Sequence, residues 1–170
     1  TGLQGVLESL RARTRAGAAF VALRLPSKPE PRLVARTGID AEEALRLAGA
    51  LQPENAAPQV FMHVDGKLAS EFPALAQRAG AVLCQPLAVE QRLLGMLYLE
   101  RPRGERRAPF SQEDIDFVAT YAGLASVLLH DNFREEFDVP GPQPGREDVH
   151  PALRRILTTD AGMYRILALA

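Results

Sequence analysis

Residues 81–133 read AVLCQPLAVEQRLLGMLYLERPRGERRAPFSQEDIDFVATYAGLASVLLHDNF. Two apolar runs at the start of this stretch, 81–89 and 93–100, are typical of β-strands. The polar residues Glu90, Gln91 and Arg92 between them predict a turn, and a charged loop with proline and glycine comes after the second run. We therefore expect a β-hairpin, then a loop, then a long helix over 112–133.

The expected helix has a wide apolar face. Ser111 with Asp114 three residues later is typical of a helix start, because the serine oxygen can accept a backbone N–H of the first turn. Apolar residues then recur at helical spacing, and the stripe consists of Ile115, Val118, Ala122, Ala125 and Leu129, flanked by Tyr121, Leu124 and Leu128. This face is wide enough to pack on a sheet and still offer a seam to a second helix.

The residues before this stretch predict a further set of alternating elements. Apolar spacing from Leu3 to Leu10 predicts an opening helix that ends near Arg15, and Asp40 is placed to cap a helix that runs to about Leu51. A weaker helical segment spans about 68–78. Short apolar runs bounded by turn residues predict strands, which are 18–25, 32–37 and 59–64.

This order of elements resembles a GAF domain over roughly Leu3 to Phe133. The resemblance is carried by Pro86-Leu87 in the first strand of the hairpin, by Gly95 in the second, and by Phe110-Ser111 leading into Glu113-Asp114. It implies an α/β (α+β) fold with a central mixed, mainly antiparallel sheet of about five or six strands between helical layers. GAF domains are mostly modules for sensing small molecules and for dimerisation.

Composition excludes several classes of function. The 170 residues are 46% hydrophobic and 24% charged, which is ordinary for a globular protein, and the net charge of −1 offers no general attraction to nucleic acids or membranes. No apolar run approaches the ~20 residues that span a bilayer. The one cysteine cannot form an internal disulfide. We expect a cytoplasmic protein that binds neither DNA nor membranes through these residues.

A ligand site is implied by the resemblance alone. GAF cavities usually lie on the side of the sheet away from the terminal helices, here walled by Val60 to His63, Leu68 to Leu75 and the strand around Cys84. Phe61, Met62 and Phe72 would supply the apolar lining, and His63 and Cys84 the polar or polarisable contacts. Whether Phe61 or Met62 faces inward depends on the register of the strand.

Neither His63 nor Cys84 has the surroundings that catalysis or metal binding requires. Cys84 lies mid-strand without a nearby Lys, Arg or His to stabilise a thiolate, so a buried hydrophobe is favoured over a redox sensor. Met62 and His63 are neighbours that point to opposite faces of a strand, so they cannot both bind one metal ion. With no catalytic set of residues, we expect neither an enzyme nor a cofactor.

The loop after the second hairpin strand departs from one group of GAF domains. Domains that bind cyclic nucleotides carry an Asn-Lys pair where this chain has Glu100-Arg101, although Phe110 and Asp114 fit the pattern. The departure argues against a cyclic nucleotide. The arginines of the loop either contact an anion or partner or simply form a solvated loop, and they are Arg101, Arg103, Arg106 and Arg107.

The composition of the last 33 residues predicts a domain boundary near residue 138. We assign 1–137 to the GAF-like sensory domain, 138–149 to a linker rich in proline and glycine, and 150–170 to the start of a downstream module. Met163 and the apolar residues after it resemble the segment that opens the AAA+ ATPase module of sigma-54-dependent activators. The Gly and Ser-Pro of that segment are replaced here by Thr158, Asp160 and Ala161. A dimerisation helix or another effector is the alternative.

These features together predict a regulatory domain. The resemblance implies the sensory part of a bacterial sigma-54-dependent transcription regulator, with an AAA+ module and sigma-54 RNA polymerase as partners of the whole protein and an unknown small molecule as ligand. A GAF domain of a histidine kinase, cyclase or phosphodiesterase and a ligand-free dimerisation scaffold are the alternatives. The apolar faces of Leu3 to Leu10 and Ile115 to Leu129 exceed what one sheet face covers, so we expect a homodimer.

Overall fold

A five-stranded antiparallel sheet organises the computed structural model, which describes residues 2–61, 63–104 and 109–138. The strands are β1 (Ala18–Leu23), β2 (Arg32–Thr37), β3 (Gln59–Phe61), β4 (Ala79–Val89) and β5 (Arg92–Pro102). Their order in the sheet is β2-β1-β5-β4-β3, and each neighbouring pair is antiparallel. The expected α/β fold and strand number are confirmed. The sheet expected as mixed contains no parallel pair among the described strands.

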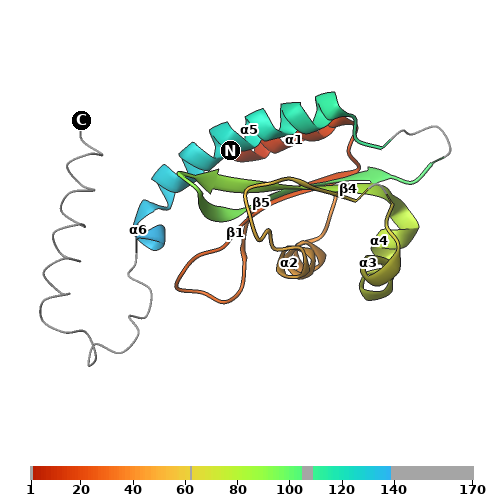
Figure 1. Cartoon of the computed structure of the whole chain (residues 1–170), viewed down its shortest axis with the longest axis horizontal. Coiled ribbons are helices and arrows are strands. Elements are labelled where there is room, and N and C mark those ends of the chain that lie inside the picture. Colours follow the sequence, from red (N-terminus) through yellow and green to blue (C-terminus); the bar gives the residue numbers. More distant parts are fainter. Residues whose placement is uncertain (1, 62, 105–108, 139–170) are drawn as a thin grey trace, which may run out of the picture. The chain divides into compact units, whose positions relative to one another are not determined.

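Helices cover both faces of the sheet (Figure 1). Helix α1 (Gly2–Thr14) and helix α5 (Gln112–Asn132) lie on one side, and α2 (Ala41–Ala50), α3 (Gly66–Glu71) and α4 (Pro73–Arg78) lie on the other. A short helix, α6 (Arg134–Phe137), comes directly after α5. We call the two sides the α1/α5 face and the α2–α4 face. The chain divides into two compact units, Thr1–Val139 and Pro140–Ala170, and the second unit, with most of the expected linker and all of the expected downstream module, lies outside the described residues.

Strand β5 is buried on both faces because it lies in the middle of the sheet. Met96 and Tyr98 belong to the core on the α2–α4 face, whereas Leu97 and Leu99 belong to the core on the α1/α5 face. The same alternation divides β1 between the two cores. Successive side chains of a strand point to opposite faces, so the near-continuous apolar runs of the sequence are what a sheet covered on both sides requires.

The β4–β5 hairpin has a two-residue turn. Val89 pairs with Arg92, and the two residues between them, Glu90 and Gln91, have φ angles of 49° and 66°. Positive φ at both central positions is the mark of a type I′ turn, whose twist matches that of antiparallel strands. The turn is thus one residue shorter than expected, and Arg92 begins β5.

Helix α5 begins and packs as expected. Ser111 Oγ accepts the backbone N–H of Asp114 while the Asp114 carboxylate accepts the N–H of Ser111, which forms a capping box. The predicted stripe is buried at Val118, Ala122, Ala125 and Leu129. The flanking Leu124 and Leu128 are exposed.

Two segments near the middle of the chain differ from expectation. Strand β3 has three residues rather than the six expected over 59–64. The helical segment expected over 68–78 is two helices that meet at Phe72, whose φ and ψ of −129° and 71° are not helical. Pro73 explains the break, because proline disfavours helical angles in the preceding residue and is well suited to the first turn of a new helix.

Gly95 of β5 is required by the close approach of β1. A Cβ atom at this position would lie 2.0 Å from the carbonyl oxygen of Ala22 and 2.8 Å from the Cα of Leu23. Both are backbone atoms of the paired strand, so neither can move without disturbing the sheet.

We therefore predict that Gly95→Ala lowers the free energy of unfolding by about 3 kcal/mol or more, since overpacking against backbone leaves no side chain free to move. Urea unfolding followed by circular dichroism measures this. Gly49→Ala in α2 is the control, because a Cβ there meets nothing within 4 Å and alanine favours the helix. Equal stability of Gly95→Ala and the native chain would contradict the packing of β1 on β5.

Candidate functional site

Aromatic and aliphatic side chains fill the α2–α4 face, where the resemblance placed a ligand cavity. Phe20 of β1 and Tyr98 of β5 stack with ring centroids 4.5 Å apart and planes 13° from parallel. Leu47 of α2 and Leu75 of α4 are fully buried over the same face. The centre of this side of the domain is therefore a packed core.

A buried ion cluster lies in this core. Glu100 of β5 is 4% exposed, and it accepts hydrogen bonds from Arg78 Nε at 2.6 Å, from Arg78 Nη2 at 3.1 Å and from the Tyr98 hydroxyl at 2.8 Å. Arg78 Nη1 also donates to Glu43 Oε1 of α2 at 2.7 Å. We call these four residues the Glu100 network. It joins the sheet to α4 and to the first turn of α2.

The network holds its donors in one protonation state. The hydrogen bonds to Glu100 raise the pKa of Arg78 further above its already high value, and those to Glu43 add to this although burial opposes it. Burial, with the neighbouring Glu100 carboxylate, raises the pKa of Tyr98 well above 10. Both groups keep their protons near neutral pH, and the hydrogen bonds of the network hold α2 and α4 on the sheet.

The structure brings together three of the five candidate ligand residues. Phe61, Phe72 and Cys84 all contribute to the core on the α2–α4 face, so Phe61 is the residue of β3 that faces it. His63 is exposed and lies beyond the end of β3, because the strand stops at Phe61. The prediction that His63 lies on this strand is wrong. Met62 lies outside the described residues.

Cys84 behaves as a small buried hydrophobe. Its side chain is 1% exposed, and burial raises the pKa of its thiol to about 12. A thiolate is the reactive form of cysteine, so we expect this buried thiol to react slowly in the folded domain. Among residues 2–61, 63–104 and 109–138 there is no group of three or more His, Cys, Asp and Glu residues placed to hold a metal ion.

Sequence reasoning missed the Glu100 network. Its partners Glu43 and Arg78 are far from Glu100 in sequence and come from separate helices. One signal was present: Glu100 is a charged residue near the end of a buried strand, two positions after Tyr98 and therefore on the same face. A buried charge of this kind needs a partner of opposite charge.

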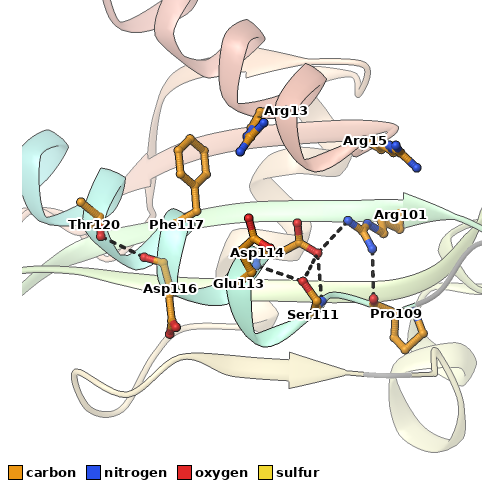
Figure 2. Close-up of a pocket in the computed structure, with 10 residues that line it drawn as sticks. All are labelled: Arg13, Arg15, Arg101, Pro109, Ser111, Glu113, Asp114, Asp116, Phe117 and Thr120. Carbon is orange, nitrogen blue, oxygen red and sulfur yellow. Dashed lines mark hydrogen bonds and ion pairs between the residues drawn. The ribbon is translucent and has the colours of Figure 1, made fainter.

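On the α1/α5 face, a groove of about 870 Å³ lies between the end of α1 and the start of α5 (Figure 2). Its lining residues include Arg13 from the last turn of α1, Arg15 just after that helix, and Glu113 and Asp116 from α5. Within the described part of the chain these four side chains form no ion pair, although the Arg13 guanidinium lies 5.7 Å from the centroid of the Phe117 ring. The groove thus carries two basic and two acidic side chains, of which Asp116 accepts a hydrogen bond from Gln112 at 2.8 Å.

Arg101 crosses the floor of this groove as a structural link. It donates to the Thr14 carbonyl oxygen at 2.7 and 3.0 Å, to the Pro109 carbonyl oxygen at 3.0 Å and to Asp114 at 2.9 Å, and Figure 2 shows the last two of these contacts. Burial opposes ionisation of Asp114, but the hydrogen bonds from Ser111 and Arg101 outweigh it and lower the pKa of this carboxyl. Of the other loop arginines, Arg103 is exposed, and Arg106 and Arg107 lie outside the described residues.

The last described residues, those of α6, pack against the domain. Phe137 of α6 is 1% exposed, and the aromatic ring of His130 stacks beside it with centroids 6.2 Å apart. Arg32, the first residue of β2, binds both carboxylate oxygens of Glu136 at 2.9 and 3.0 Å. Arg92, the first residue of β5, donates to the Phe137 carbonyl oxygen. We call this set the α6 anchor.

The native thiol supplies a direct test of the α2–α4 core. We predict that Cys84 does not react with a maleimide or a disulfide reagent at pH 8 in the folded domain, because it is buried and protonated, and that it reacts fully in denaturant. Thiol titration with and without urea measures this. Stoichiometric reaction of the folded protein within minutes would contradict the burial of Cys84.

None of the helices among the described residues combines the length and the hydropathy of a membrane span. No curated protein sequence matches the chain.

Solved structures share the fold at low sequence identity. The GAF domain of a phosphoenolpyruvate-protein phosphotransferase from Coxiella burnetii is 18% identical, with a TM-score of 0.62 over 78% of this chain and 83% of that one. A domain of a putative two-component sensor histidine kinase from Sinorhizobium meliloti is also 18% identical, with a TM-score of 0.59 over 79% and 92%. A GAF domain/HD domain protein from Geobacter sulfurreducens is 14% identical, with a TM-score of 0.58 over 80% and 93%.

The family model described as GAF domain matches residues 3–129, which is most of the chain. That span runs from the start of α1 to near the end of α5 and includes the whole sheet. It therefore contains both helical layers as well as the Glu100 network. The chain belongs to the GAF domain family.

Proposed function

We propose that this chain is the sensory part of a bacterial sigma-54-dependent transcription regulator, that it acts in the cytoplasm as a homodimer, and that it controls a downstream ATPase module. A ligand or partner acts on the α2–α4 face, and the response leaves the domain through α6. Membership of the GAF family supports a sensory role. The finer assignment to a sigma-54 activator rests on the sequence of 150–170.

The observation that carries the proposal is the α6 anchor. Strand β5 bears Glu100 near one end and Arg92 at the other. A single strand therefore contacts both α4, on the α2–α4 face, and α6, the last described helix. A signal that shifts Arg78, directly or through Glu43, moves the Glu100 side chain that Arg78 binds. Packed interiors transmit strain, so in this proposal such a shift is passed along β5 to Arg92 and to Phe137.

The nature of the signal depends on how full the α2–α4 face is. Because Phe20, Tyr98 and Leu75 pack against one another there, a small molecule would need α3, α4 or β3 to move before it could contact Phe61, Phe72 and Cys84. A partner that pulls on α2 or α4 would need no such cavity. The packed face also favours the scaffold alternative over a permanently open pocket.

A sensory domain of a signalling enzyme is the second candidate. It is favoured by the similarity to a domain of a putative sensor histidine kinase. The two candidates predict different gene sequences downstream of residue 170. A phosphate-binding GxxxxGK[ST] motif shortly downstream supports the ATPase, whereas a kinase, cyclase or phosphodiesterase domain would overturn the sigma-54 assignment.

The anchor can be tested by removing its arginines. We predict that the double variant Arg32→Ala, Arg92→Ala speeds amide hydrogen exchange of residues 133–138 by about tenfold or more. The variant loses the ion pair to Glu136 and the hydrogen bond to the Phe137 carbonyl oxygen, which hold α6 in place. In the whole regulator the same double variant should leave the ATPase unresponsive to the signal.

Exchange in β1 and β5 should remain at the native rate, and Arg103→Ala, which changes an exposed arginine outside the anchor, is the matched control. Unchanged exchange at 133–138 in the double variant would contradict the anchor. Faster exchange with an unchanged response of the ATPase would contradict its role as the exit for the signal.

The proposal also predicts that the domain is not itself catalytic. The purified chain should show no ATPase, cyclase or peptidase activity and should bind duplex DNA no better than nonspecifically, since the described polar clusters serve packing and the net charge is −1. Turnover assays and fluorescence anisotropy check this. A robust turnover that Glu100→Gln abolishes in folded protein would overturn it.

A further inference from the structure

We propose that the loop between β1 and β2, residues 24–31, forms a binding site for a small organic anion, a phosphate monoester with a short aliphatic group. Figure 1 shows this loop at the same end of the domain as α6. The site shares no residue with the cavity that the family resemblance implies around Phe61, Phe72 and Cys84. Only its coupling to α6 rests on the proposed function.

A basic hollow of about 500 Å³ opens on this loop. Arg24, Ser27 and Lys28 line it, and none of its lining residues is acidic. All three are exposed, and within the part of the chain that the structure describes their side chains make no ion pair or hydrogen bond. Two cations and a hydroxyl around one hollow suit a phosphate group, which accepts charge-assisted hydrogen bonds and carries a charge of about −1.5 to −2 at pH 7.

The loop is held in one shape by its own residues. The Lys28 N–H donates to the Leu25 carbonyl oxygen at 3.1 Å, which closes a turn, and the Arg24 N–H donates to the Leu94 carbonyl oxygen at 2.7 Å. Leu25 is 1% exposed, so it fixes the base of the loop in the core. Prolines restrict the rest of the backbone, and they are Pro26, Pro29 and Pro31. A loop that is already ordered loses little conformational entropy when it binds a ligand.

An apolar crevice adjoins the basic hollow. Its volume is about 20 Å³, which is room for one group the size of a methyl. Ala22, Ala48 and Met96 of its lining belong to the core on the α2–α4 face. Arg24 and Leu93 line both the hollow and the crevice, so the two spaces share a boundary. A ligand with its phosphate in the hollow can therefore place an aliphatic end in the crevice.

This site differs from the packed centre of the α2–α4 face in what binding requires. A small molecule would contact Phe61, Phe72 and Cys84 only after a helix or β3 moves, because aromatic and aliphatic side chains fill that region. The basic hollow is open at the surface and needs no such movement. Binding to it therefore carries no cost for opening the core.

The site is continuous in sequence with the α6 anchor. Pro31 lines the crevice and directly precedes Arg32, and Leu93 directly follows Arg92. These two arginines are the ones that bind α6. A ligand held between Pro31 and Leu93 fits their positions in the docked state, so it shifts the equilibrium of α6 toward docking.

Nuclear magnetic resonance titration of the isotope-labelled domain tests the site, with butyl phosphate as the probe at constant ionic strength. We expect saturable shifts of the amide signals of residues 24–30 and 93. Methyl phosphate, which has the same charge but cannot reach the crevice, should bind about fivefold or more weakly, since each buried CH₂ is worth about fourfold in affinity. Butylamine should not shift these signals. Their failure to shift in a saturable way with butyl phosphate at millimolar concentration would overturn the proposal.

Charge variants show whether the two cations bind the phosphate. Arg24→Gln and Lys28→Gln should each weaken butyl phosphate binding about fivefold or more, because each loses a charge-assisted hydrogen bond. Arg103→Gln is the matched control, since Arg103 is exposed and lies outside the hollow. Equal weakening by Arg103→Gln would show only general attraction of anions and would also overturn the proposal.

A variant that fills the crevice tests its role separately. Ala48→Val should make butyl phosphate bind no better than methyl phosphate, while methyl phosphate binds as it does to the native domain. Leu93→Ala, which removes a wall of the crevice, should also reduce the preference and replaces Ala48→Val if that variant does not fold. An unchanged preference for butyl phosphate in both folded variants would contradict the crevice as the place of the aliphatic group.

Amide hydrogen exchange separates the site from its coupling. Butyl phosphate should slow exchange of residues 133–138 in the native domain and have no such effect in the double variant Arg32→Ala, Arg92→Ala. Binding without any change in exchange would contradict the coupling to α6 and leave the ligand site in place. Absence of binding would contradict the site itself and leave the α6 anchor and the proposed function untouched.

Discussion

The burial of strand β5 on both faces is the constraint on which the rest of the domain depends. A central strand with Tyr98 on one side and Leu97 and Leu99 on the other cannot be left uncovered on either side. The chain meets this requirement with two unlike layers. One consists of two long helices with apolar inner stripes, and the other of three shorter helices, two of which, α2 and α4, are held by the Glu100 network. The two layers therefore differ, because Leu124, Val127 and Leu128 of α5 are more than half exposed, whereas Leu45 of α2 is 37% exposed.

Local patterns predicted most of the fold because the elements are locally consistent. The stripe of α5, the cap at Ser111 and the hairpin around Glu90 and Gln91 are all encoded within a few residues, and all were found. Asp40 also caps α2 as expected, accepting the backbone N–H groups of Glu42 and Glu43. The wrong predictions concern the length of an edge strand and a helix that a proline interrupts. Strand β3 ends early, and Pro73 divides a segment whose apolar spacing alone suggested one helix.

The candidate site was predicted less well, for a physical reason. The family resemblance placed Phe61, Phe72 and Cys84 on the same side of the sheet, and the core of the α2–α4 face contains all three. Ion pairs between Arg78 and two carboxylates far away in sequence leave no local pattern. The docking of Phe137 was also missed, since four residues after a long helix carry too little periodicity to show which face is buried. In each case the missing information is tertiary.

The α6 anchor sets how often the exit of the domain is open at equilibrium. Burying one large apolar side chain contributes about 1.5–3 kcal/mol. The Arg32–Glu136 pair is nearly half exposed and adds little to that. A whole domain has a stability of about 5–15 kcal/mol, so α6 detaches far more often than the sheet unfolds. By this measure roughly one molecule in ten to one in a hundred has α6 undocked at any moment. A bias larger than about 1.5–3 kcal/mol makes the undocked form the more populated one.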